Sequence, residues 1–593
     1  MSQQENNNIV KNFYRASAAD FNKIPGCPIA YWPSQKLRDS FSDHKSLAEV
    51  AKPRQGLATT DNDRFLKFWF ECSEHNMALP HSLQPDVKWY PCQKGGGFRK
   101  WFGNNDYIVN WKNDGEEIKQ IVKARYGSAS KRVVNEHLYF HEGITWSSLS
   151  SAALSMRYVP SGFIFETKGS MCFFDEKESL LQTLGFCNSC IVNPLLQCIS
   201  PTLDFHEGPV GTLPISNRVN FRAVEIANKA IAIAKNDWDS FEISWDFIGL
   251  PLLDSDYRQP TLSTSYQNIR THWCNLTQEM QHLEEENNNL FIDDYGLRDE
   301  LTPEVPLNDI TLTCNPHYRY GGNLTDEERE ARLQSDTIAE LISYAIGCMM
   351  GRYSLDREGL IYAHAGNEGF KALVEEGAYA TFAADDDGIL PLTSENWFAD
   401  DVAARIEAFV RTVWGAETLE ENLQFIADSL CLAAIKPVKK GGETARETIR
   451  RYLSTQFFKD HMKTYKKRPI YWLFSSGKEK AFECLVYLHR YNEATLPRMR
   501  TEYVTPLLGQ MAGRIERLRL QQAEAGTAEA KRIGKDIDSL TKQLTELRAF
   551  DDELKHHADM RITLDLDDGV KVNYGKFGTL LSEVKAITGD KGE

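Results

Sequence analysis

The sequence predicts a mixed α/β region followed by a mainly α-helical region that carries a long antiparallel helical hairpin. Three observations lead to this fold class. Short apolar runs separated by glycine and charged turns occupy the chain up to about residue 165 and are typical of strands. Beyond residue 214 the apolar residues recur at helix spacing, and after residue 508 they alternate in steps of three and four. A chain of 593 residues with 42% hydrophobic side chains should form more than one domain.

The expected domains follow one another along the chain. We assign residues 1–22 to a flexible tail, 23–250 to an α/β target-recognition domain, 251–500 to a mainly helical domain, 501–560 to an antiparallel coiled-coil hairpin, and 561–593 to a β-hairpin with a C-terminal tail.

The first domain begins with residues 29–41, which read as an extended entry followed by a short helix. Strands are expected at residues 107–111, 133–140 and 162–165. A helix should then cover residues 177–197, and a second should cover 221–235, where alanine and isoleucine repeat at helix spacing.

The second domain is expected to be helical with short extended interruptions. An acidic helix at residues 266–289 precedes a strand-like run at 310–314. Thr325 and Glu328 form a capping box that should start a helix ending at Met350. Thr444 with Glu447 forms a second capping box, and the basic helix that follows leads into the aromatic, strand-like residues 466–478.

The C-terminal region predicts two helices that fold back on each other. One seam runs through Leu508, Met511, Ile515 and Leu518, and the other through Ile533, Ile537, Leu540, Leu544 and Leu547. Gly526 and Thr527 can end the first helix and cap the second. A β-hairpin turning at Asp568 and Gly569 is expected to close the fold.

The net charge of −16 argues against a uniformly basic coat for nucleic acid, but the charge is uneven. Residues 45–135 hold 15 lysines and arginines against 10 acidic residues, and residues 436–468 hold 11 against 3. Between them, residues 367–430 hold 3 against 14. The acidic region should repel a phosphate backbone, so DNA binding should be confined to the two basic regions. The chain contains no apolar run long enough to cross a bilayer and no export signal, and its scattered cysteines suit a reducing compartment, so we expect a cytoplasmic protein without membrane partners.

Residues 88–115 combine aromatic, basic and glycine residues more densely than any other stretch, which favours a surface for nucleic acid. Flat aromatic faces come from Trp89, Tyr90, Trp101, Phe102 and Tyr107. The polar candidates for DNA contact are Lys94, Arg99, Lys100, Asn104 and Asn105, with Asn110 as a further amide. The alternative is a strand pair with a glycine-rich turn and aromatics buried in its core.

Residues 52–64 suggest a loop that reaches into a DNA groove. Its candidate DNA-binding residues are Lys52, Arg54, Gln55, Thr59, Asn62 and Arg64, among which arginine suits guanine and glutamine or asparagine suits adenine. A solvated connection is the alternative. In the second basic region, Arg446, Arg450 and Lys463 should face outward and contact the DNA backbone, with a merely solvated face as the alternative.

No catalytic or metal site is predicted. Cys187 and Cys190 have metal-ligand spacing, but no second pair follows at a fitting distance. Residues 315–318, NPHY, resemble the tetrapeptide with which amino-group methyltransferases hold a flipped base. His317 departs from that pattern, and no strand-glycine-helix turn for S-adenosylmethionine accompanies it, so we interpret the tetrapeptide as a turn.

Five segments in order resemble one known family: KPRQGLATTDNDRF from Lys52, KWYPCQKGGGFRKWFGNNDYIVNWKNDG from Lys88, LISYAIGCMMGRYSLD from Leu341, KRPIYWLFSSGK from Lys467 and LDLDDGVKVNYGKFG from Leu564. They resemble the C-terminal half of PglX, the adenine-specific DNA methyltransferase of BREX phage defence. The resemblance implies a target-recognition half similar to those of type IIG and TaqI-like enzymes. It also implies that the methylase half, with its S-adenosylmethionine site, is absent from this chain.

The expected partners are double-stranded DNA, the methylase half and other defence proteins. Three classes of function stay open: a non-catalytic DNA-recognition module, a complete methyltransferase that uses Asn315 and Tyr318, and a scaffold that binds other defence proteins through the helical hairpin. The missing glycine motif disfavours the second class, and the basic regions favour the first over the third.

Overall fold

The computed structural model describes residues 17–79, 86–148, 153–200, 204–216, 218, 220–438 and 442–589. The chain forms two compact units, neither continuous in sequence. Unit 1 comprises Met1–Lys67, Met77–Trp238 and His272–Gly321, and unit 2 comprises Phe68–Asn76, Asp239–Thr271 and Gly322–Glu593. The fold is mixed α/β, as the sequence predicts.

Unit 1 contains a four-stranded antiparallel sheet in the order β2-β9-β6-β7. Its strands are β2 (Lys52–Arg54), β9 (Met171–Phe173), β6 (Gly143–Trp146) and β7 (Met156–Val159). All residues of the central strands β6 and β9 are buried, so this sheet forms much of the core of the unit. A separate two-stranded ladder joins β1 (Lys45–Ser46) to β10 (Pro214–Ile215).

A second sheet has the order β3-β5-β4-β8, with strands β3 (Leu66–Phe68), β5 (Tyr107–Asn110), β4 (Trp89–Gln93) and β8 (Ile164–Phe165). β4 pairs antiparallel with β5 and parallel with β8. The strand predicted at 107–111 is thus confirmed, whereas the strand predicted at 162–165 is present only at Ile164–Phe165, because Gly162 lies in a turn with positive φ. The strand predicted at 133–140 is wrong, because Asn135 is left-handed (φ 54°) and starts a short 3-10 helix, η4 (Glu136–Leu138).

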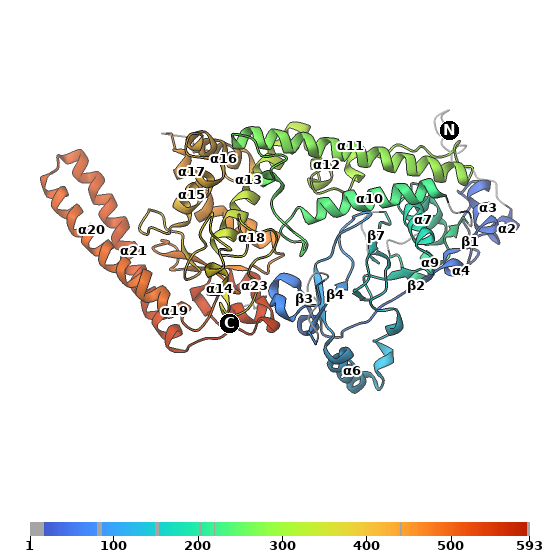
Figure 1. Cartoon of the computed structure of the whole chain (residues 1–593), viewed down its shortest axis with the longest axis horizontal. Coiled ribbons are helices and arrows are strands. Elements are labelled where there is room, and N and C mark those ends of the chain that lie inside the picture. The colour runs from blue at the N-terminus through green and yellow to red at the C-terminus, as the bar shows by residue number, and fades with distance from the viewer. Residues whose placement is uncertain are drawn as a thin grey trace, which may run out of the picture. The chain divides into compact units, whose positions relative to one another are not determined.

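The helices of unit 1 surround these strands, and Figure 1 shows the strands between α10 and α6. They are α2 (Ala18–Phe21), α3 (Gln35–Asp43), α4 (Leu47–Val50), α5 (Asn62–Phe65), α6 (Lys112–Tyr126), α7 (Lys177–Cys187), α8 (Val192–Ile199), α9 (Glu207–Gly211), α10 (Phe221–Asp239) and α12 (Pro316–Arg319), with 3-10 turns η3 (Ala129–Lys131) and η6 (Leu307–Asp309). Helix α11 (Leu262–Asp294) begins in unit 2 and ends in unit 1.

Three expectations for unit 1 need correction. The single helix expected at 177–197 is two helices, because the Asn188 side chain leaves the helix to bond the backbone N–H and C=O of Met156. Residues 29–33 are not a strand, although α3 follows with Ser34 as its N-cap. Residues 310–314 are not a strand either, because the backbone N–H groups of Thr313 and Cys314 donate to the Asp237 carboxylate instead of to a neighbouring strand.

Unit 2 is mainly helical and holds one small antiparallel sheet in the order β11-β13-β12, from β11 (Ile389–Pro391), β13 (Glu483–Tyr487) and β12 (Tyr471–Ser475). Its helices are α13 (Asp326–Met349), α14 (Phe370–Glu375), α15 (Val402–Trp414), α16 (Leu419–Ala433), α17 (Ala445–Tyr452), α18 (Phe458–Thr464), α19 (Thr495–Arg498), α20 (Thr505–Glu524), α21 (Thr527–Asp559), α22 (Val570–Gly575) and α23 (Val584–Thr588). Shorter turns are the 3-10 segments η1 (Trp69–Glu71), η2 (Glu74–Asn76), η5 (Pro251–Leu253), η9 (Leu566–Asp568) and η10 (Gly578–Leu580), and the π segments η7 (Leu453–Phe457) and η8 (Met499–Val504).

Local capping signals in unit 2 set the helix starts. Both predicted capping boxes are present: Thr325 caps α13 with Glu328, and Thr444 caps α17 with Glu447. Each box satisfies two backbone N–H groups that the first turn of a helix leaves without partners.

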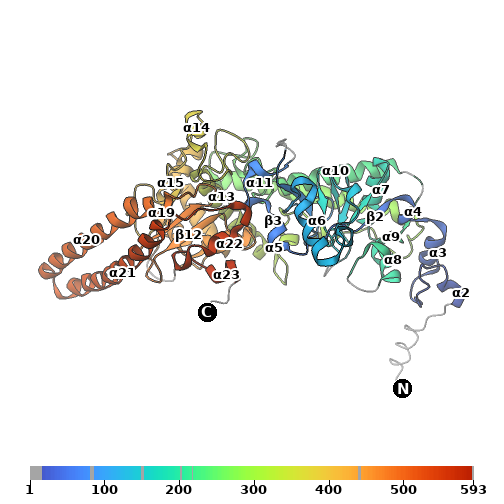
Figure 2. The same ribbon diagram turned by 90° about the horizontal axis from the view of Figure 1, so that it is seen from below.

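Helices α20 and α21 lie side by side as two long arms (Figures 1 and 2). Met511 and Ile515 of α20 and Ile533, Ile537 and Leu540 of α21 are buried along the seam. The β-hairpin predicted around Asp568 is wrong. Gly569 instead ends the 3-10 turn η9 and precedes α22, because the Asp565 side chain caps η9 and the buried Asn573 side chain donates to the Asp565 carbonyl.

Within the described residues, no helix has both the length and the apolarity to cross a membrane.

Candidate nucleic-acid interface

The loop predicted at residues 52–64 is shorter in the structure, because Lys52–Arg54 forms strand β2 and Asn62–Phe65 forms helix α5. The loop between them, residues 55–61, is held on both sides by its neighbours in unit 1. Leu57 donates its N–H to the Phe165 carbonyl (3.0 Å) and accepts from the Thr167 N–H (3.1 Å). On the other side the Ala58 N–H donates to the Arg132 carbonyl (2.8 Å), and the Asn135 amide donates to the Gln55 carbonyl (2.9 Å). The loop therefore has a fixed backbone, which is what a surface needs if it is to position side chains on a ligand.

The first half of the segment 52–64 presents polar side chains to solvent. Lys52, Arg54 and Gln55 are exposed. Lys52 pairs with Asp175 at 3.0 Å. Among the described residues, the Arg54 guanidinium donates only to the neighbouring Pro53 carbonyl (2.8 Å) and keeps further N–H groups for a ligand. Arg54 and Gln55 are thus the two side chains of this segment best placed to reach a base edge.

The second half of the segment is occupied by its own structure. Thr59 is buried, and its hydroxyl donates to the Asn62 side-chain oxygen at 2.5 Å, so the predicted DNA contact by Thr59 is corrected to a structural role. Asp61 caps α5. Asn62 and Arg64 are exposed, but Arg64 pairs with Glu117 of α6.

The glycine run at residues 95–97 packs against a turn at residues 166–169. Gly95 has φ +79°, and a Cβ there would lie 2.7 Å from the Lys168 carbonyl oxygen, so only glycine fits this close approach. The Gly96 N–H donates to the Ser147 hydroxyl at 2.9 Å. Lys94 is half-buried with its ammonium 4.8 Å from the Tyr107 ring centre, and the half-buried Asn104 donates to the Gly97 carbonyl (3.0 Å).

Arg99 lies inside unit 1. Its guanidinium donates to the Asp237 carboxylate (2.7 Å), the Phe102 carbonyl (2.9 Å) and the Thr313 hydroxyl (2.9 Å). The side chains of Arg99 and Asp237 are 4% and 1% exposed. The phosphate or base contact expected of Arg99 is therefore corrected: its charge is neutralised within the fold.

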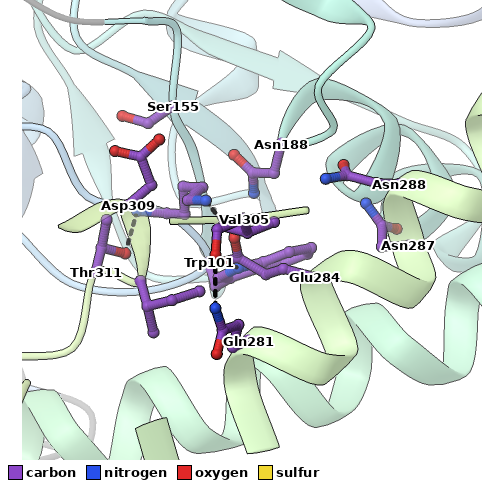
Figure 3. Close-up of polar contacts among 12 residues, drawn as sticks. Trp101, Ser155, Asn188, Gln281, Glu284, Asn287, Asn288, Val305, Asp309 and Thr311 are labelled. Carbon is purple, nitrogen blue, oxygen red and sulfur yellow. Dashed lines mark hydrogen bonds and ion pairs between the residues drawn. The ribbon is translucent and has the colours of Figure 1, made fainter. Parts of the chain in front are cut away.

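Lys100 is also buried and neutralised within unit 1. Its ammonium pairs with Glu284 of α11, whose other oxygen accepts from the Trp101 indole N–H at 2.8 Å (Figure 3). Burial raises the pKa of Glu284, while the Lys100 ammonium opposes that rise. The Lys100 N–H also donates to the Thr311 hydroxyl (3.0 Å), so both its backbone and its side chain are used inside the unit.

Further polar side chains of α11 fix the surrounding loops (Figure 3). Gln281 donates to the Val305 carbonyl (2.7 Å), Asn287 to the Gly185 carbonyl (2.8 Å) and Asn288 to the Pro303 carbonyl (2.9 Å). This face of α11 thus donates hydrogen bonds to backbone carbonyls of α7 and of the segment at residues 303–305. It holds residues 98–102 in place, and we assign it a structural role.

The aromatic side chains of residues 88–115 also point inward. Trp89, Trp101, Phe102 and Trp111 are buried, and Asn105 accepts from the Gln93 amide (2.8 Å). The alternative interpretation, a strand pair with buried aromatics, therefore describes this stretch, and the predicted DNA-facing surface is corrected for Arg99, Lys100 and Asn105. The deciding carboxylates, Asp237 and Glu284, lie 138 and 184 residues further along the chain, where no local pattern could reveal them.

In unit 2, two of the three predicted DNA contacts of the second basic region are used in ion pairs. Arg446 is exposed but forms ion pairs with Glu407 (2.7 Å) and Glu420 (2.6 Å). Arg450 does not face outward: its guanidinium pairs at 2.9 Å with Asp401, which is fully buried. Lys463 is exposed at the end of α18 and is the member of this group most open to a phosphate.

The NPHY tetrapeptide forms the start of α12. The Asn315 side chain accepts from the His317 N–H (3.1 Å) and donates to the Leu307 (2.7 Å) and Ile310 (2.8 Å) carbonyls, which uses its amide hydrogens and oxygen internally. The Tyr318 hydroxyl donates to the Phe98 carbonyl at 2.5 Å. These contacts support the interpretation of residues 315–318 as a turn.

Cys187 is buried at the end of α7, and burial raises the thiol pKa of both Cys187 and Cys190 above the ordinary value. In the ranges that the structure describes, no group of three or more histidine, cysteine or acidic side chains is arranged to hold a metal ion.

Comparison with known proteins gives two strong matches, although no protein-family description matches the chain. The adenine-specific methyltransferase BrxX of Escherichia coli O9:H4 (strain HS) is 51% identical over 578 residues, which cover 97% of this chain and 46% of BrxX. The chain is homologous to adenine-specific methyltransferases. The adenine-specific methyltransferase PglX of Lacticaseibacillus casei (strain Zhang) is 38% identical over 575 residues, covering 95% of the chain and 45% of PglX.

The chain spans about half the length of the curated relatives it matches. The resemblance to adenine-specific methyltransferases is thereby confirmed. Which half of these proteins it corresponds to, and which of their activities it carries, remain predictions.

Proposed function

We propose that this chain is the DNA target-recognition portion of a site-specific adenine methyltransferase of BREX phage defence. The observation that carries the proposal is the anchored loop of unit 1: backbone bonds on both sides fix residues 55–58, while the side chains of Arg54 and Gln55 stay exposed. Arginine can donate two bonds to guanine and glutamine can form a bidentate pair with adenine in the major groove. Arg54 and Gln55 are therefore assigned to base reading.

In this proposal the methyl transfer belongs to the part of the relatives outside the matched region. Asn315 and Tyr318, which could otherwise hold a target adenine, are occupied by backbone partners in unit 1. We therefore assign S-adenosylmethionine binding to the part of the intact enzyme outside the matched region. Calorimetry with S-adenosylmethionine tests this: saturable binding by the chain that is abolished by Asn315→Ala would restore the tetrapeptide as a catalytic motif.

The experiment for base reading uses the intact enzyme and maps methylated adenines across a genome. Arg54→Ala and Gln55→Ala should relax or shift the methylated motif, because each bidentate base contact gives about 1–3 kcal/mol of discrimination. The matched control is Lys52→Ala. It removes a nearby cation that is already paired with Asp175. An unchanged motif in both variants, with only the amount of methylation altered, would place base reading elsewhere.

A scaffold function is the second candidate, and the helical hairpin favours it. The connected ends of α20 and α21 stand clear of the small sheet of unit 2 in Figures 1 and 2. Leu520, near the end of α20, is 69% exposed. If the hairpin binds other defence proteins, Leu520→Lys should reduce their copurification with the intact enzyme and leave the methylated motif unchanged. Unaltered copurification would remove the support for this candidate.

A further inference from the structure

The exposed cations of unit 1 fall into two groups. Several are neutralised by carboxylates: Lys36 pairs with Asp299 (3.2 Å), Lys177 with Glu142 (2.6 Å) and Lys229 with Glu225 (3.0 Å). Lys131, Arg132 and Lys168 are equally exposed, and each lacks a carboxylate partner among the residues that the structure describes. Their positive charge therefore remains open to an external anion.

These three cations lie on chain segments that touch the anchored loop from opposite sides. The Arg132 carbonyl accepts from Ala58, so the segment 131–132 adjoins one side of the loop. The Leu57 carbonyl accepts from Thr167, and Leu57 also forms a parallel bridge with Glu166, so the turn that carries Lys168 adjoins the other side. The two cationic positions thus bracket the loop.

Packing fixes both flanking segments. The Arg132 guanidinium lies 4.8 Å from the ring centre of Tyr126, at the end of α6, and the Arg132 N–H donates to the Ala129 carbonyl (3.1 Å). The turn at 166–169 is closed by the Gly169 N–H, which donates to the Glu166 carbonyl (3.0 Å). The flanking cations therefore start from defined backbone positions.

The acidic groups nearby do not cancel these charges. Glu166 is buried, and its carboxylate accepts from the Thr167 hydroxyl (2.9 Å) and the Lys168 N–H (2.8 Å) of its own turn. Glu136 pairs with Lys119. Lys131, Arg132 and Lys168 thus keep exposed positive charges in a chain of net charge −16, and such charges can bind a polyanion.

We propose that Lys131, Arg132 and Lys168 bind phosphates of duplex DNA on either side of the base-reading loop. This inference rests on the proposed DNA-recognition function and assigns a second task within it. Long, exposed, flexible cations suit phosphate contact, which positions a protein on DNA without reading its sequence. Because cations flank the loop on both sides of Leu57 and Ala58, the two backbones that border a groove can each be held.

The test measures the affinity of the chain for duplex DNA at several salt concentrations. A variant with Lys131→Ala, Arg132→Ala and Lys168→Ala is compared with a control carrying Lys36→Ala, Lys177→Ala and Lys229→Ala, which removes the same charge from ion-paired positions of unit 1. Each lost phosphate contact should lower the slope of log affinity against log salt by about 0.9. The test variant should therefore lose about 2–3 units of slope, and the control should lose less than about 1.

The DNA sequence used as a probe separates positioning from reading. The triple variant should lose affinity by the same factor for target and unrelated duplexes, whereas Arg54→Ala should lose more for the target. Equal slopes in the test variant and the control would overturn the inference. If the unaltered chain binds no duplex at low salt, the proposed function fails as well. If Arg54→Ala weakens binding to the target duplex while the triple variant keeps the affinity and salt slope of the unaltered chain, only the phosphate contacts are refuted.

Discussion

Two polar, basic segments of unit 1, residues 52–64 and 94–105, have similar composition and opposite environments. Arg54 and Gln55 of the first are exposed where strand β2 ends and a loop with a fixed backbone begins. Arg99 and Lys100 of the second are buried against Asp237 and Glu284. A basic residue in a polar, glycine-containing stretch is therefore open to DNA only where the fold supplies no carboxylate.

The neighbouring side chains explain the difference. Trp101 and Phe102 follow the second pair of cations directly and are buried, so the chain between them and the glycine run is drawn into the core. Arginine and lysine that enter a core must be paired. In the first segment, Gly56 and Ala58 beside Leu57 provide no comparable apolar bulk, and Arg54 and Gln55 stay outside.

Removing one buried cation of the second segment should have the largest effect. Lys100→Met leaves the Glu284 carboxylate, which is 3% exposed, without its cation, and should lower the free energy of unfolding by about 3–5 kcal/mol. Urea denaturation measures this change. Lys168→Met is the matched control at an exposed position and should stay within about 0.5 kcal/mol. If Lys100→Met lowered the free energy of unfolding by less than about 1 kcal/mol, the result would contradict the burial of the pair.

A second substitution sharpens this prediction. Glu284→Gln in the Lys100→Met background removes the stranded negative charge and keeps an acceptor for the Trp101 indole. The double variant should recover part of the lost stability, because the penalty comes mainly from an unpaired buried charge. No recovery would indicate that lost packing of the lysine chain dominates.

The second basic region offers the same contrast inside unit 2. Arg450→Ala leaves the fully buried Asp401 without its guanidinium and should cost about 3 kcal/mol. Arg446→Ala breaks exposed ion pairs with Glu407 and Glu420 and should cost at most about 1 kcal/mol. Denaturation of the two variants side by side checks the difference, and equal losses would mean that Asp401 does not depend on Arg450.

The pH dependence of unit 2 should reveal a graded effect that grows with each pH unit. Burial lowers the pKa of His461 and of His489 from 6.5 to about 3. The neutral His461 ring accepts from the Ile470 (3.1 Å) and Tyr471 (3.0 Å) N–H groups. Between pH 6.5 and about 3 the unfolded chain binds more protons, so stability falls as pH decreases, by about 1.4 kcal/mol per unit for each histidine.

The His461→Gln variant isolates one of these two contributions, because glutamine offers an acceptor that does not titrate. Its stability should fall about half as steeply as that of the unaltered chain below pH 6.5, as denaturation at several pH values would show. The same steepness in both proteins would assign the acid sensitivity to other groups.

The smallest expected effect belongs to the exposed loop itself. Arg54→Ala should leave the free energy of unfolding within about 0.5 kcal/mol, since its guanidinium contacts only a neighbouring carbonyl. Arg64→Ala, which breaks the exposed pair with Glu117, should cost at most about 1 kcal/mol. Thermal unfolding checks both variants. If Arg54→Ala lowered the free energy of unfolding by more than about 2 kcal/mol, Arg54 would have a structural role.

The sequence alone predicted the elements whose causes are local. The capping boxes at Thr325 and Thr444 fixed the starts of α13 and α17, because a cap bonds backbone groups three residues away. A short apolar run between polar turns likewise predicted β5. The family resemblance was also readable from the sequence, since it depends on residue identity rather than on packing.

Tertiary structure decided which predicted site residues face solvent. Arg54 and Arg99 both lie near glycines. Of these two, Arg99 meets a carboxylate, 138 residues away in sequence, and Arg54 meets none among the described residues. Asp565 and Asn573 formed helical turns where the sequence suggested a hairpin, because their side-chain bonds to backbone outweighed strand propensity. Ion pairing and burial are properties of three-dimensional neighbours, and a charge in a sequence acquires its role only when the fold brings its partner to it or leaves it in water.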